Sequence, residues 1–288
     1  MTTTLAPARP EAAAGRATFA ALTAREMRRF IVNPVFLFAV GMTAWVVIDP
    51  SLSDNEINSV NPYPAIFLGG FGMMATFWLT RSMRASEPLI SVVPVTLPRR
   101  TAALCSVAVV PFLCGCVALL RFLHSFPVSD PLYGAFSPSA RVAVLVGQIV
   151  VPALGGPLLG VALGRWVRFP GAAFVAFLIL FGWVNLATVP SLTHPDSTPA
   201  TVLRLFAPFA FFTLHGNAGH ITAWRGSPWF FIGWQLALCA IAVLVALLRG
   251  TEGQARVRII GALTIAGGAA LIMLVLAGTG GFTHAVVT

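Results

Sequence analysis

Lysine is absent from this 288-residue chain, because all 18 basic residues are arginine. Its absence excludes two kinds of chemistry. The phosphate-binding loop of P-loop ATPases needs a lysine to contact the nucleotide phosphates, and a Schiff base needs a lysine amine. We therefore do not expect the chain itself to hydrolyse ATP through such a loop.

Charged residues are also scarce: they make up 9% of the chain, whereas 57% of the residues are hydrophobic. Soluble domains carry about 25% charged residues. The uncharged residues form long runs, which predicts an all-α polytopic membrane protein. The net charge of +9 could indicate a nucleic-acid partner. The arginines cluster at the ends of apolar runs, however, and this favours anchoring in the lipid bilayer and no nucleic acid.

The N-terminal region is predicted to lie in the cytoplasm. Residues 1–15 lack the apolar segment of a signal peptide and are expected to form a disordered tail. Residues 16–32 then have the pattern of an amphipathic helix that lies in the membrane interface. We expect its anchors to be Arg25, Arg28, Arg29 and Phe30.

Seven apolar runs predict membrane spans, six of them within residues 33–249 and the last within residues 250–288, after a basic turn. They are residues 35–48, 65–80, 101–120, 142–163, 171–189, 229–248 and 259–277. Gly156, Gly160 and Gly164 form a ridge that predicts a close approach of two helices. A stretch at about 200–216 is too short to cross and is expected to be re-entrant on the outer side.

The distribution of arginine predicts the orientation. Fourteen of the 18 arginines fall on the side of the N-terminus. Positive charge favours the cytoplasmic side, so the N-terminus is expected inside and the C-terminus outside.

The loop at residues 81–100 is the strongest functional candidate. It contains four arginines and a small apolar island around Leu89, Ile90 and Val93. A helix there would be only about two turns long and would not fold alone. It therefore needs the membrane surface or a partner protein.

Here the chain resembles the permease subunits of ABC-2-type transporters, in particular actinobacterial members. In that family an amphipathic N-terminal helix precedes six core spans, and the loop after the second span commonly reads Glu-x-Leu-Leu-x-x-x-Pro-Val, followed by basic residues. The matching residues in this sequence are Glu87, Leu89, Ile90, Pro94, Val95, Arg99 and Arg100. Pro88 and the seventh span depart from the pattern.

The resemblance implies an ATP-driven exporter in the bacterial plasma membrane. Two permease copies, identical or different, would pair and dock two copies of a separate ABC ATPase, which would bind ATP and magnesium. Glu87, Leu89, Ile90, Val93, Pro94, Arg99 and Arg100 would couple the permease to that ATPase. The chain itself would be no enzyme and would hold no cofactor or metal, and its exported substrate stays open.

Several weaker candidates remain. A set of aromatic and polar residues could line a translocation path, although packing or lipid contact is the common role of such residues: Phe71, Phe77, Trp78, Phe174, Phe177, Phe181 and Asn185. Gln148 is another polar residue inside a span. His215 and His220 are too few for a structural zinc site. A membrane scaffold without transport and an ion-driven carrier are the alternative functions, and the absence of charge inside the spans disfavours the carrier.

Overall fold

The described part of the chain is almost entirely helical. The computed structural model describes residues 10–48, 63–85, 96–125, 138–193, 206, 215–217, 220–222, 227–279 and 286–287. The helical elements are α1 (Pro10–Ile31), α2 (Pro34–Ile48), η2 (Ala65–Phe71), α4 (Gly72–Ala85), α6 (Leu97–Ser106), α7 (Val109–Ser125), α9 (Pro138–Leu145), η3 (Val146–Val150), α10 (Val151–Trp166), α11 (Ala172–Thr193), α13 (Pro228–Leu248) and α14 (Gly253–Thr279), of which η2 and η3 are π-helical. Three short strands, β1 (His215–Asn217), β2 (His220–Thr222) and β3 (Val286–Val287), form an antiparallel sheet in that order.

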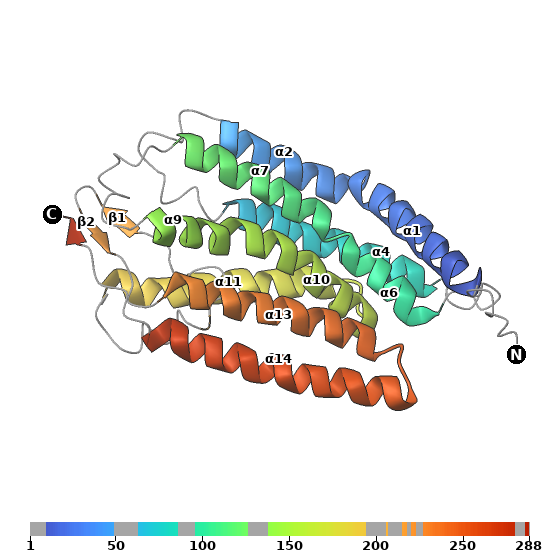
Figure 1. Ribbon diagram of the computed structural model, residues 1–288. Coiled ribbons are helices and arrows are strands. Elements are labelled where there is room, and N and C mark those ends of the chain that lie inside the picture. Colours follow the sequence, from blue (N-terminus) through green and yellow to red (C-terminus); the bar gives the residue numbers. More distant parts are fainter. Residues whose placement is uncertain are drawn as a thin grey trace, which may run out of the picture.

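The helices run side by side, and the chain passes back and forth between the two ends of the bundle (Figure 1). As a result, α1 begins at one end of the bundle and α14 finishes at the other, near the small sheet. α10 is the central helix, because it packs against α4, α13, η2, α7, α6 and α11. α14 lies at the edge and packs mainly against α13.

Several helices have the length and composition of membrane spans. Four qualify, namely Leu97–His124, Val142–Trp166, Pro228–Leu248 and Gly253–Thr279. A fifth would be α1 and α2 taken together as one bent pair, and Ala172–Leu186 is a shorter apolar helix. Helices cover all seven predicted runs, and the fold is that of an all-α protein suited to a membrane.

Asn33 and Pro34 form the corner between α1 and α2. Asn33 Oδ1 accepts a hydrogen bond from the amide of Val35 at 3.0 Å, and Pro34 occupies the first position of α2. An asparagine cap followed by proline is a favoured helix start. The two helices meet at an angle of 63°.

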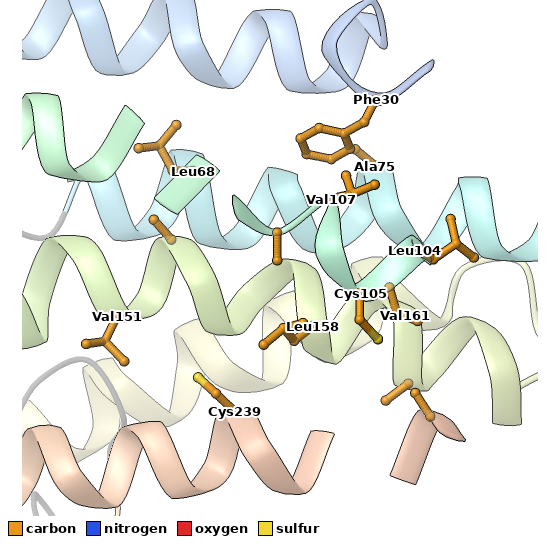
Figure 2. Close-up of a cluster of buried hydrophobic side chains, with 14 of the residues drawn as sticks. Phe30, Leu68, Ala75, Leu104, Cys105, Val107, Val151, Leu158, Val161 and Cys239 are labelled. Carbon is orange, nitrogen blue, oxygen red and sulfur yellow. The ribbon is translucent and has the colours of Figure 1, made fainter. Parts of the chain in front are cut away.

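The hydrophobic core surrounds α10 (Figure 2). Leu158 and Val161 of α10 belong to one cluster with Leu68 of η2 and Leu104 of α6. Phe30 of α1 joins this cluster and is fully buried. The core therefore links α1 to the centre of the bundle.

The glycine ridge of α10 packs directly against η2 and α4, which confirms the predicted close approach. A Cβ atom at Gly156 would lie 2.1 Å from the carbonyl oxygen of Gly69, and one at Gly160 would lie 2.2 Å from that of Met73. Along the same contact Thr76 donates a hydrogen bond to the carbonyl of Pro157 at 2.8 Å. Small residues and hydroxyl groups of this kind hold helices together where lipid replaces water.

Two predicted segments differ from the structure or fall outside its description. α1 begins at Pro10, so that residues 10–15, expected in a disordered tail, belong to the helix. Proline suits a first helical position, and the alanines that follow have high helix propensity. Of the predicted re-entrant segment at 200–216, only Phe206 and the start of β1 are among the described residues.

Candidate functional site

Most described arginines gather at one end of the bundle, which we call the basic end. It comprises α1, the last turns of α4 and α10, the start of α6 and the turn between α13 and α14 (Figure 1). Its arginines are Arg25, Arg28, Arg29, Arg81, Arg84, Arg99, Arg100, Arg165, Arg168 and Arg249. Such an accumulation at one end is the pattern expected where helices meet a negatively charged membrane surface.

A polar clasp ties α1 to α4 at this end. The Arg29 guanidinium donates to both carboxylate oxygens of Glu26, at 3.2 and 3.0 Å, and to Ser82 Oγ at 3.1 Å. Glu26 is only 6% exposed, and a buried carboxylate of this kind needs a cationic partner. The clasp therefore fixes α1 against the last turns of α4.

α1 also packs against α6. Since α4 ends at Ala85 and α6 begins at Leu97, α1 contacts both helices that flank residues 86–95. α1 therefore connects the two helices on either side of residues 86–95.

A second group of polar contacts caps the end of α10. Arg249 donates a hydrogen bond to the carbonyl of Arg165, and its guanidinium lies 5.8 Å from the ring centre of Trp166. Trp166 Nε1 in turn donates to the carbonyl of Val245 at 2.8 Å. Cations at a helix C-terminus satisfy free carbonyls and complement the helix dipole. The α13–α14 turn is thereby attached to α10.

The residues predicted to couple to an ATPase are only partly described. Glu87, Leu89, Ile90, Val93 and Pro94 lie outside the described residues. Arg99 is exposed and Arg100 is half-buried, both in the first turns of α6. The structure thus places the basic part of the predicted motif at the basic end.

The predicted interfacial anchors fall into two groups. Arg25 and Arg28 are exposed, whereas Arg29 belongs to the clasp. Phe30 does not face a lipid surface: it is fully buried, and its ring centre lies 4.2 Å from that of Phe36. The prediction treated α1 as a helix lying on a membrane, but α6 and α4 cover the side that carries Glu26 and Phe30.

Part of the predicted aromatic path forms a chain of ring contacts between η2 and α11. The ring centres of Phe71 and Phe177 are 6.0 Å apart, as are those of Phe177 and Phe181. Asn185 donates to the carbonyl of Phe181 at 2.7 Å and is exposed, as is Phe174.

The other predicted path residues do not join this chain. Phe77 is fully buried and packs against Ala172 and Ala173, while Trp78 is 50% exposed at the surface of α4. The aromatic residues therefore do not converge on one site.

The sequence interpretation missed the acid that anchors the clasp. Glu26 lies three residues before Arg29, a spacing that allows an ion pair on a helix. That spacing could have pointed to the pair, but not to its burial. The sequence analysis also assigned no role to Gln235. In the structure, Gln235 Nε2 donates a hydrogen bond to the carbonyl of Gly147 at 3.0 Å inside the bundle.

In comparisons with known proteins, no family model, no curated protein and no solved structure matches this chain. Within the described ranges, no group of three or more histidine, cysteine, aspartate or glutamate side chains could hold a metal ion. The arrangement at the basic end is thus one of cationic and backbone contacts that connect helix ends.

Proposed function

We propose that this chain is the membrane-spanning permease subunit of an ATP-driven ABC exporter. Six core spans and an additional C-terminal span would form the transmembrane domain, with the basic end in the cytoplasm. Residues 81–100 would dock a separate ATPase, and a second permease copy would complete the transporter. The substrate class is open.

The observation that carries this proposal is the packing of α1 against both helices that flank residues 86–95. A loop that receives force from an ATPase must pass it to the spans. The clasp of Arg29, Glu26 and Ser82 supplies a connection of this kind on the α4 side, and the contact between α1 and α6 supplies it on the other. The absence of lysine is consistent with this proposal, because a chain without a P-loop lysine would depend on another chain for ATP hydrolysis.

The deciding experiment is purification of the full chain in mild detergent, followed by mass spectrometry of the proteins that copurify. We expect an ABC ATPase, and we expect Leu89→Asp to release it. Val257→Asp is the matched control, since Val257 is 67% exposed near the start of α14 and is not part of residues 81–100. The control should retain the ATPase.

Two outcomes would overturn the proposal. If the folded chain brings down no ATPase, the non-transporting scaffold becomes the better explanation. If Leu89→Asp and Val257→Asp behave alike, residues 81–100 do not form the docking site.

A further inference from the structure

Gln148, in the π-helical segment η3, lies inside the bundle with its amide oxygen unsatisfied. The residue is 5% exposed, and its Oε1 atom is closed to solvent and has no hydrogen-bond partner among the described residues. A buried acceptor without a donor is costly, and native structures contain few of them. A donor that reaches this atom from within the protein would remove that cost.

The neighbouring residue, Gly147, already accepts from such a donor. Gln235 of α13, which is 4% exposed, donates through Nε2 to the carbonyl of Gly147 at 3.0 Å. A Cβ atom at Gly147 would lie 3.3 Å from Gln235 Oε1 and 3.5 Å from Ile232 Cγ1, so position 147 faces α13 directly. Gln148 therefore lies one position away from the residue that faces the amide donor.

The π-helical geometry of η3 accounts for this offset of one position. The amide of Val151 donates to the carbonyl of Val146, five residues earlier. An α-helix would use the carbonyl four residues earlier, which is that of Gly147. Conversion of η3 to an α-helix would thus rotate the chain before Val151 by about one position, or about 100°. Gln148 would then face α13 where Gly147 faces it now.

The same conversion exchanges hydrogen bonds without losing any of those named. In the α-helical form the carbonyl of Gly147 would accept from the amide of Val151, and Gln235 Nε2 would be released from that carbonyl. The released amide would then face Gln148 and donate to its Oε1 atom. Amide side chains of this kind form hydrogen bonds between helices inside membranes. Each of the two forms therefore gives Gln235 Nε2 an acceptor.

The side chains of α9 permit the rotation, because apolar residues would replace apolar residues. α9 directly precedes η3 and lies at the end of the bundle away from the basic end (Figure 1). Val144 belongs to one cluster with Phe231 of α13. Leu145 belongs to another cluster with Phe122 of α7. A shift by one position puts Leu145 in the place of Val144 and Val146 in the place of Leu145, and cores tolerate such exchanges best.

We propose that η3 is a two-state segment that converts between this π-helical form and an α-helical form. Gly147 lies opposite Gln235 in the first form, and Gln148 lies opposite Gln235 in the second. The conversion turns α9 about its axis by one residue position, while α10 keeps its contacts with η2 and α4. The device goes beyond the proposed transport function and does not depend on it.

Disulfide cross-linking in native membranes tests the rotation with both glutamines in place. The full-length chain without its four native cysteines carries Phe231→Cys together with either Val144→Cys or Leu145→Cys. The 144–231 pair reports the π-helical form, and the 145–231 pair reports the rotated form. Oxidation traps a minor form each time it occurs, so a population of about 0.1–10% is enough for detection. We expect both pairs to cross-link, the 145–231 pair more slowly.

Two further variants connect the rotation to the amides. Gln148→Leu cannot accept the bond from Gln235, so we expect it to slow the 145–231 cross-link about tenfold, the loss of one hydrogen bond. The 144–231 cross-link should keep its rate. Ile149→Val is the matched control, because it changes the adjacent buried residue and leaves both amides intact. It should cross-link like the unmodified sequence.

Three results would refute the device. Absence of a 145–231 cross-link, with the 144–231 cross-link present, would show that η3 has one fixed form. Equal slowing by Gln148→Leu and Ile149→Val would show that the amide of Gln148 does not stabilise the rotated form. If Gln148→Leu slows the 145–231 cross-link as strongly in a Gln235→Leu background, the two amides do not bind each other.

Discussion

Gly160 lies where α10 and α4 approach most closely. This approach is possible because glycine has no side chain. A Cβ atom there would lie 2.2 Å from the Met73 carbonyl oxygen and 2.3 Å from Thr76 Oγ1. Backbone cannot move aside cheaply, so we expect Gly160→Ala to destabilise the fold by roughly 1–3 kcal/mol. Gly261→Ala is the control, because nothing lies within 4 Å of that position in α14. Thermal unfolding in detergent should show a lower midpoint only for Gly160→Ala.

Thr76 adds a polar contact to the same interface. Its hydroxyl donates to the Pro157 carbonyl at 2.8 Å, whereas the Thr264 hydroxyl bonds only to the Ile260 carbonyl of its own helix at 3.2 Å. We expect Thr76→Val to cost about 0.5–1.5 kcal/mol and Thr264→Val to cost little. Chemical unfolding in mixed micelles measures both. Equal effects would show that the bond between α4 and α10 contributes no stability.

At the scale of elements, α1 shows what periodicity can and cannot predict. The sequence predicts a helix over residues 16–32, and α1 covers that range up to Ile31. It does not predict which face turns inward, because lipid and a protein core both favour apolar side chains. Glu26 and Phe30 lie one turn apart on the face that α4 and α6 cover, and the ion pair with Arg29 makes the buried acid acceptable there.

The attachment of α1 to α4 depends on Arg29. Arg29→Ala leaves the Glu26 carboxylate buried without its partner and removes the bond to Ser82. Because Arg29 is 41% exposed, we expect a loss of about 1–3 kcal/mol rather than the full cost of a buried charge. Arg25→Ala, at an exposed position, should cost under about 0.5 kcal/mol. Hydrogen exchange should be faster in α1 of the first variant alone, and equal rates in both variants would contradict the clasp.

For the whole molecule, the all-helical character is predictable from the sequence, but the irregularities of the helices are not. Each of the seven long uncharged runs predicts a helix. The reason is that a helix satisfies all of its own backbone hydrogen-bonding groups where water is absent. The π-helical segments η2 and η3 have an additional residue per turn. The spacing of hydrophobic residues in the sequence does not reveal so small a change in helix geometry. The ring contact between Phe71 at the end of η2 and Phe177 of α11 is likewise a tertiary contact that the sequence pattern does not specify.

The orientation of the molecule can be tested on α14 alone. This helix has 27 residues, about 40 Å at the usual rise per residue, which exceeds the roughly 30 Å apolar layer of a bilayer. Glu252, just before α14, and Thr279, at its last residue, are both exposed. In a background without the four native cysteines, a membrane-impermeant maleimide should label Thr279→Cys on intact cells. It should label Glu252→Cys only after permeabilisation, because the basic end is expected in the cytoplasm. Labelling of both positions from one side would mean that α14 does not cross the membrane, and the opposite pattern would reverse the proposed orientation.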